Sequence, residues 1–249
     1  MSLEAFFFGE GVFGVWRAGQ VNQHVWVLVP PFGEEEKSAR RTLTDIAQTF
    51  HKRGEGSLLF SFRGTGDSSG DLAALGLEEW REDLRNALAE VRRRAVETSV
   101  GLLGVRLGAS LALQTALEDS EVSEVVLIEP LLSGRSFLSQ QMMRQKIRAQ
   151  MTGDAAQPQT EGHVEDLDGW ALGEKMKSQL QSLDVMKEQI SLKATAKIIQ
   201  VGPKPEVAPP LRALGEKTGA STQAVVMPPF WNLLDYSDPS PLLDVLESR

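Results

Sequence analysis

Hydrophobic positions along the chain follow two periods that alternate and so predict alternating strands and helices. Short continuous apolar runs are typical of buried strands, and apolar residues three or four positions apart are typical of helices packed on one face. Two early apolar runs separated by Gly-Glu-Gly predict a β-hairpin. The predicted strands are 5–8, 12–16, 24–29, 57–62, 99–103, 122–128, 196–201 and 222–227. The predicted helices are 37–51, 77–96, 108–118, 136–151, 173–183, 208–218 and 239–248.

This order of elements indicates an α/β fold in which helices flank a mostly parallel central sheet. The alternation breaks between residues 133 and 170. A helix rich in Gln and Met is followed there by a polar loop over 153–162 and by an expected strand over 164–171. We expect 133–170 to be a short insertion over the sheet, where a lid would lie. Residues 1–249 are expected to form one domain.

Composition narrows the classes of function. The chain has 249 residues, of which 41% are apolar and 24% charged, and this suits one large domain. Its net charge of −8 opposes binding to nucleic acid and to anionic membranes, although ordinary solubility also explains it. The absence of cysteine excludes disulfides and thiolate catalysis.

The remaining composition predicts neither a cofactor nor a metal site. The three histidines, His24, His51 and His163, do not have the spacing of metal ligands. No apolar run reaches the roughly 20 residues that span a bilayer, so no membrane span is predicted. The opening residues lack the basic start of a signal peptide, and we expect a cytoplasmic protein. No particular oligomeric state is predicted.

The stretch LLGVRLGASLALQTAL carries the most specific pattern in the chain. Gly104 and Gly108 bracket Arg106 with the spacing of the nucleophile elbow G-x-S-x-G, between a predicted strand and a predicted helix. Arginine cannot replace the serine nucleophile, because it stays charged and only donates hydrogen bonds. The backbone N–H of Leu107 is expected to point into the site. Ser110 lies one turn beyond the elbow, inside the helix.

The other parts of a Ser-His-Asp triad are also missing from their expected places. An acid would follow strand 196–201, where Glu206 is the nearby carboxylate. A histidine would follow strand 222–227, but the residues there read PPFWN. His163 is expected to be a solvated loop residue. The glycine-rich loop that follows Phe62 lacks the Lys-Ser/Thr end of a phosphate-binding loop, and we interpret it as a structural turn.

Five stretches in chain order resemble one family. They are PPFGEEEKSARR, FRGTGDSSGD, LLGVRLGA, EPLLSGRSFL and PPFW, between Val29 and Trp231. Together they resemble the exosortase A system-associated hydrolase 2 group, bacterial α/β-hydrolase-fold proteins linked to exopolysaccharide and protein-sorting loci. The resemblance implies an α/β-hydrolase fold and no particular substrate. We expect a small-molecule or glycan-related ligand. The elbow of that group also carries arginine, which makes Arg106 a group feature; Val105 replaces its usual leucine.

An arginine at a helix head faces the positive end of the helix dipole and requires an anionic partner. Glu129 ends the neighbouring strand, and Glu34 and Glu35 follow strand 24–29. We expect a bidentate pair between Arg106 and Glu129 or Glu34, with Asp67 in reserve.

Two interpretations of the site stay open. In the first, Arg106 has a structural role, with its guanidinium held by carboxylates, and the pocket has no function. In the second, Arg106 and the N–H groups of Leu107 and Phe32 bind an anionic group, beside Trp231 at the pocket rim. The site carboxylates, Glu34 and Glu129, would then tune the site or act on water. The chain is accordingly expected to be a divergent hydrolase that acts on an anionic or ester-bearing molecule, or a non-catalytic binding or scaffolding protein.

Overall fold

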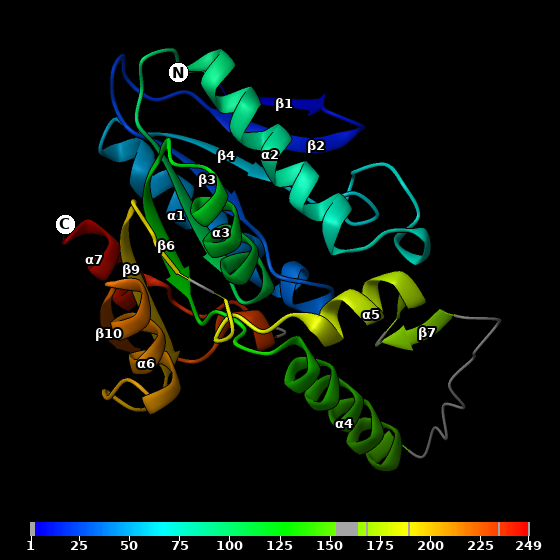
Figure 1. Ribbon diagram of the computed structural model, residues 1–249. Helices are drawn as coiled ribbons and strands as arrows, with labels where there is room; N and C mark the ends of the chain where they lie inside the picture. Colours follow the sequence, from blue (N-terminus) through cyan, green and yellow to red (C-terminus); the bar gives the residue numbers. More distant parts are fainter. Residues whose placement is uncertain (1–2, 153–163, 168, 189, 234, 249) are drawn as a thin grey trace.

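The computed structural model describes residues 3–152, 164–167, 169–188, 190–233 and 235–248 (Figure 1). These residues form an eight-stranded sheet in the order β1-β2-β4-β3-β5-β6-β9-β10. The β1–β2 and β2–β4 pairs are antiparallel, and all the pairs from β4 to β10 are parallel. The strands are β1 (Leu3–Phe8), β2 (Val12–Arg17), β3 (Val25–Val29), β4 (Gly56–Phe60), β5 (Val100–Val105), β6 (Val122–Ile128), β9 (Thr195–Gly202) and β10 (Ser221–Val226).

Helices cover both faces of the sheet, because alternate residues of its central strands are apolar on both sides. In β3, Val25 and Val27 pack toward α2 and α3, whereas Trp26 and Leu28 pack toward α1 and α7. The helices are α1 (Glu34–Lys52), α2 (Leu77–Arg94), α3 (Leu107–Glu118), α4 (Gly134–Thr152), α5 (Glu174–Ser182), α6 (Pro209–Thr218) and α7 (Ser240–Glu247), with the 3-10 turns η1 (Leu72–Ala74) and η2 (Phe230–Asn232).

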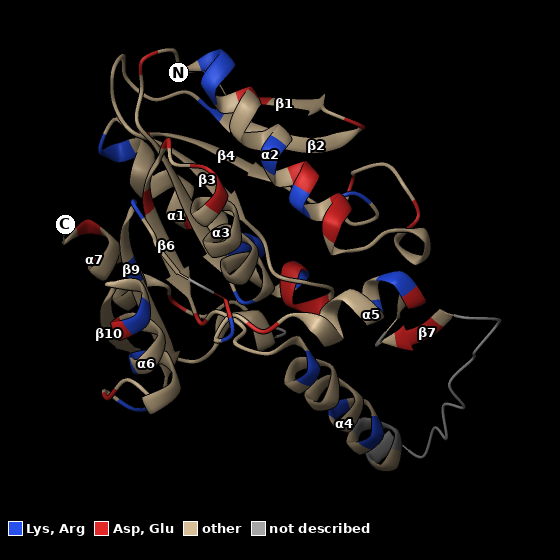
Figure 2. Cartoon of the chain, viewed as in Figure 1, with Lys and Arg blue, Asp and Glu red and all other residues tan. Residues whose placement is uncertain are grey.

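Between β6 and β9 the chain leaves the sheet. It forms α4, the hairpin of β7 (Val164–Leu167) and β8 (Trp170–Gly173), and then α5. Figure 1 shows this segment beyond the end of the sheet to which the β6 arrow points. In Figure 2, α4 contains Lys and Arg positions and no Asp or Glu, in contrast to the net negative charge of the chain.

The strand and helix predictions are confirmed with two differences. Helix α1 begins at Glu34 and not at residue 37, because three glutamates stabilise the positive end of the helix dipole in its first turn. The prediction of one strand over 164–171 is wrong. That segment is the β7–β8 hairpin, whose turn includes Gly169 with a φ of 90°. The polar loop predicted over 153–162 lies outside the described residues.

The glycine-rich loop after β4 is a structural turn. Arg63, at the start of the loop, is buried, and its Nε donates to Asp83 Oδ1 at 2.6 Å. The backbone N–H of Arg63 donates to the other oxygen of the same carboxylate at 2.9 Å. Gly64 and Gly66 have positive φ angles, which glycine adopts without steric cost. The hydrogen bonds between Arg63 and Asp83 thereby hold the loop against α2. Among the described residues, no helix is long and apolar enough to cross a bilayer.

Candidate functional site

The chain bends sharply between β5 and α3. Arg106 occupies the bend with a φ of 56° and a ψ of −118°, and α3 begins at the next residue, Leu107. A Cβ atom at Gly108 would lie 2.3 Å from the carbonyl oxygen of Pro30, and one at Gly104 would lie 2.5 Å from an atom in the first turn of α3. Both glycines are therefore required for the helix to cross the strands this closely. The spacing of the two glycines predicted this elbow correctly.

The guanidinium of Arg106 is paired with Glu35. Its Nε lies 3.3 Å from Glu35 Oε2, and its Cζ lies 5.4 Å from the centre of the Trp231 ring. An anionic partner was expected, but the choice of Glu129 or Glu34 was wrong. Successive residues of a helix point about 100° apart, so Glu35 faces the bend while its neighbour on α1 faces elsewhere.

Burial dominates the electrostatics of Glu35. Only 4% of its side chain is exposed. Loss of hydration raises the pKa of this carboxyl above its ordinary value, and the charges of Arg106 and Arg144 oppose that shift only in part. Glu35 is thus a carboxyl group that accepts a proton more readily than a solvated glutamate.

The two predicted carboxylates have other partners. Glu34 accepts a hydrogen bond from Trp170 Nε1 at 3.3 Å and lies 3.8 Å from the Lys37 ammonium. Glu129, which has a φ of 47°, accepts a hydrogen bond from the backbone N–H of Val201 at 3.1 Å. Burial raises the pKa of Glu129, and the nearby charge of Arg106 lowers it to a smaller extent. The reserve candidate Asp67 is exposed in the loop after β4.

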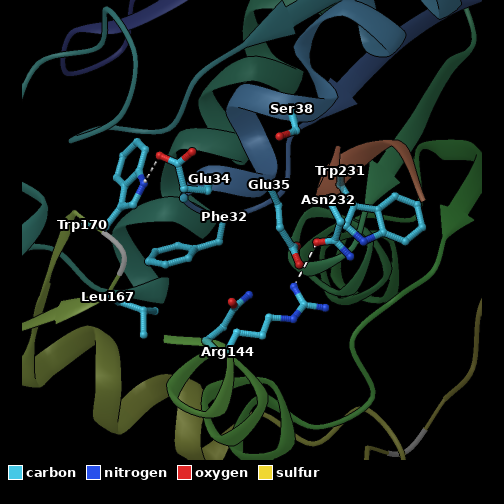
Figure 3. Close-up of a pocket in the computed structure, with 11 residues that line it drawn as sticks. Phe32, Glu34, Glu35, Ser38, Arg144, Leu167, Trp170, Trp231 and Asn232 are labelled. Atoms are coloured by element: carbon cyan, nitrogen blue, oxygen red, sulfur yellow. Dashed lines mark hydrogen bonds between the residues drawn. The ribbon is translucent and has the colours of Figure 1, made fainter. Parts of the chain in front are cut away.

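A cavity of about 380 Å³ lies beside this ion pair (Figure 3). The start of α1, α4, the β7–β8 hairpin and η2 contribute its walls. The lining residues are Phe32, Gly33, Glu34, Glu35, Ser38, Gln141, Arg144, Leu167, Trp170, Trp231 and Asn232. In Figure 3, Trp170 and Trp231 stand on opposite sides of the cavity, and Arg144 reaches in from α4 and donates to Asn232 Oδ1 at 3.0 Å.

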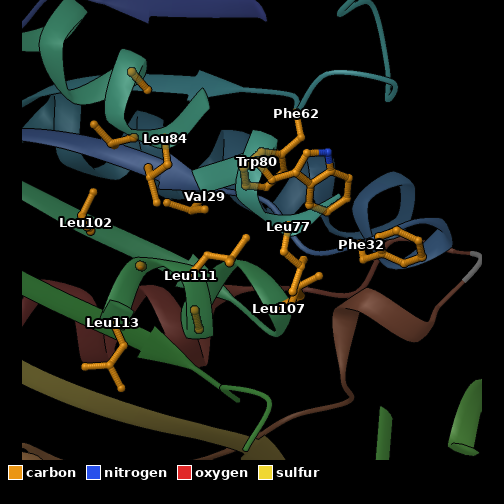
Figure 4. Close-up of a cluster of buried hydrophobic side chains, with 14 of the residues drawn as sticks. Val29, Phe32, Phe62, Leu77, Trp80, Leu84, Leu102, Leu107, Leu111 and Leu113 are labelled. Atoms are coloured by element: carbon orange, nitrogen blue, oxygen red, sulfur yellow. The ribbon is translucent and has the colours of Figure 1, made fainter. Parts of the chain in front are cut away.

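Of the three predicted apolar site residues, two line the cavity and one is buried in the hydrophobic core. Phe32 and Trp231 are buried and contribute to the cavity wall. Leu107 is fully buried in the hydrophobic cluster around Trp80, which Figure 4 shows. Sequence reasoning did not identify Trp170 or Arg144 as site residues. The sequence predicted the helix that carries Arg144, but no local pattern indicates that this helix and the β7–β8 hairpin meet at the start of α1.

The structure also shows where the candidates for the acid and the base of a catalytic triad lie. Glu206 is exposed after β9. The ring of His24 lies 2.8 Å from Ser99 Oγ, at the amino ends of β3 and β5, and His51 lies in the last turn of α1. Both histidines are therefore remote from the carboxyl ends of the strands. His163 lies outside the described residues. Ser110, which lies inside α3, donates from its Oγ to the carbonyl oxygen of Leu131 after β6.

Comparison with known proteins identifies the fold. No family model and no curated protein matches the chain. The chain resembles the Pyrococcus furiosus esterase Pf2001, with a TM-score of 0.71, 15% identity, and 99% of this chain and 89% of that chain covered. The alpha/beta hydrolase GrgF from Penicillium sp. sh18 has a TM-score of 0.65 and 16% identity, with 99% and 96% covered. Est1E from Butyrivibrio proteoclasticus, with ferulic acid bound, has a TM-score of 0.60 and 14% identity, with 94% and 91% covered. The predicted fold is confirmed: the chain has an α/β-hydrolase fold with a mostly parallel sheet flanked by helices.

Proposed function

We propose that the cavity beside Arg106 binds an anionic or ester-bearing small molecule, and that no acyl-enzyme forms at the elbow. One observation carries this proposal. The position that presents a nucleophile in this fold holds a guanidinium, which forms an ion pair with the buried Glu35 at the cavity wall. A guanidinium binds carboxylate and phosphate groups but cannot attack a carbonyl carbon.

The surroundings of the elbow support binding of a negatively charged group. Arg144 brings a second guanidinium to the cavity, next to the amide of Asn232. The backbone N–H of Leu107 lies at the amino end of α3, where a helix favours negative charge. The aromatic rings of Trp170 and Trp231 supply the apolar walls that small-molecule pockets require.

A second candidate function is hydrolysis by a water molecule activated on a carboxylate. The observation that favours it is the raised pKa of Glu35, because a general base works best when its pKa approaches the operating pH. Glu129, which is also buried with a raised pKa, is the other candidate base. The esterase named among the structural neighbours is consistent with such a reaction.

Three broader assignments belong to the same proposal. Residues 1–249 form one domain in which 133–170 acts as a lid, the protein works in the cytoplasm, and it belongs to the exosortase A system-associated hydrolase 2 group. The motifs in chain order support the last of these. The alternative within that group is a scaffolding protein of the polysaccharide or sorting system.

Covalent labelling tests the proposal directly. A serine-reactive fluorophosphonate should leave the protein unlabelled, while a serine esterase treated in parallel is labelled. Strong labelling of a serine in this chain would refute the proposal.

Turnover of p-nitrophenyl esters separates the two candidates. Hydrolysis that is present in the wild type and lost in Glu35→Gln would favour the carboxylate mechanism. Saturable binding of carboxylates or esters without turnover would favour the binding protein. The exposed variant Glu216→Gln on α6 is the matched control.

A further inference from the structure

The ion pair at the elbow is loose. Arg106 Nε lies 3.4 and 3.3 Å from the two oxygens of Glu35, and Nη2 lies 3.4 Å from Oε1. Charge-assisted hydrogen bonds of this type are usually about 2.8 Å long. Among the residues that the structure describes, none accepts a hydrogen bond from Nη1 of Arg106. The guanidinium therefore retains capacity to bind another anion.

Two cations flank one buried carboxylate at this place. Arg106 faces Glu35 from the β5–α3 bend, and the charge of Arg144 reaches Glu35 from α4. Glu34, on the same helix as Glu35, is turned to Trp170 and Lys37. The adjoining residues of η2, Trp231 and Asn232, are uncharged. Glu129 is also near the charge of Arg106, but its carboxylate accepts a hydrogen bond from the backbone N–H of Val201. Arg106, Arg144 and Glu35 therefore form a cluster with two positive charges and one exchangeable negative charge.

We propose that the ligand of this cavity is a carboxylate that takes the place of Glu35 between Arg106 and Arg144, and that Glu35 takes up one proton from solvent when it is displaced. The inference rests on the proposed function, which is binding of an anionic molecule in this cavity. No covalent bond forms or breaks except the new O–H bond of Glu35. The cluster keeps its net charge, because the ligand carboxylate replaces the ionised Glu35.

Electrostatics requires the proton. Two ionised carboxylates that share a desolvated site repel each other, and one of them becomes protonated. Burial already raises the pKa of Glu35, so protonation of this group costs less than protonation of a solvated glutamate. The ligand carboxylate, held between two guanidiniums, stays ionised.

Proton uptake predicts how affinity depends on pH. Above the pKa of Glu35, each ligand that binds takes up one proton, and affinity falls about tenfold for each pH unit. The variant Glu35→Gln has no carboxylate to protonate. Its affinity should be independent of pH in this range and higher than that of the wild type at neutral pH.

Calorimetric titration with ferulate tests the inference, with methyl ferulate as a neutral probe of the same shape. Titrations in two buffers that differ in ionisation enthalpy measure the protons taken up. We expect one proton per ferulate for the wild type and none for Glu35→Gln or for methyl ferulate. Arg144→Ala should weaken ferulate binding at least severalfold, while Arg135→Ala, which removes an exposed charge from the same helix, should not.

The outcomes separate this inference from the proposed function. Ferulate binding that takes up no proton and is the same at every pH would overturn the exchange and leave the proposed function standing. Binding of methyl ferulate alone would also overturn the exchange, since an ester-bearing ligand would then occupy the cavity. Absence of binding by both probes to the folded wild type and to Glu35→Gln would overturn both proposals.

Discussion

Arg106 has a backbone conformation that non-glycine residues rarely adopt. A φ of 56° with a ψ of −118° costs an L-residue about 1–3 kcal/mol. The surroundings enforce it, because the N–H of Arg106 donates to Ile128 O at 2.9 Å and Gly108 packs against Pro30. The side chain then lies where its charge can meet Glu35. The ion pair and the strained bend therefore occur at the same residue.

Substitution at residue 106 should reverse the usual order of alanine and glycine. Both Arg106→Ala and Arg106→Gly remove the guanidinium, but only glycine relieves the backbone strain. We expect Arg106→Gly to have the larger free energy of unfolding, by about 1 kcal/mol. Urea denaturation with equal slopes for the two variants is the measurement. A more stable alanine variant would show that the bend is not strained.

Glu35 should also make stability depend on pH. Because its pKa is raised in the folded protein, the native state binds more protons than the unfolded state above 4.5, the ordinary glutamate value. The contribution of Glu35 is thus fully present below that value and is lost as the pH rises through the native pKa. Glu35→Gln should flatten this fall in the free energy of unfolding, and the exposed control Glu216→Gln should retain it. Parallel pH profiles for all three proteins would contradict the assignment.

The elements differ in how well the sequence predicts them. Strands β3, β5 and β6 and helix α3 have strong apolar patterns, and the G-x-R-x-G spacing fixes the bend between two of them. The choice of Glu35 over Glu34 could not be predicted, because it depends on the rotation of α1 relative to the bend. The contribution of Trp170 depends on how a hairpin distant in sequence folds over α1, and no local pattern encodes that packing.

The close crossing of α3 over β3 should tolerate no added methyl group. A Cβ at Gly108 would meet the carbonyl oxygens of Pro30 and Val29 at 2.3 and 2.4 Å. We expect Gly108→Ala to lower the free energy of unfolding by about 3 kcal/mol or more. Gly202 at the end of β9 has open space around its Cβ position, so Gly202→Ala should change stability by less than about 0.5 kcal/mol. Thermal denaturation of the two variants makes the comparison, and equal effects would refute it.

At the scale of the whole molecule, two hydrophobic clusters share one sheet. Trp80 lies in the cluster beneath α2 and α3, and Trp26 lies in the cluster beneath α1 and α7. Because the same strands contribute to both clusters, neither face can lose its packing without exposing the other. The segment of α4, β7 and β8 packs Phe137, Leu167 and Leu172 into the first of these clusters and also contributes to the cavity wall.

The two faces should therefore unfold together. The combined substitutions Trp26→Phe and Trp231→Phe remove the tryptophans of one cluster. A second variant, in which Trp16, Trp80 and Trp170 are all replaced by Phe, removes those of the other cluster. We expect both variants to give denaturation curves in which fluorescence and far-ultraviolet circular dichroism change at the same midpoint. Two separated midpoints within one variant would contradict the expectation of a single cooperative domain.

The bend has a consequence for engineering. Gly104, Gly108 and Pro30 impose it from outside residue 106, so the backbone shape persists whatever side chain stands there. A serine introduced at residue 106 would lie at the bend without any change of the backbone. A histidine could be introduced at Asn232, which borders the cavity. The backbone geometry of the bend is thus independent of the chemistry of the side chain that it carries.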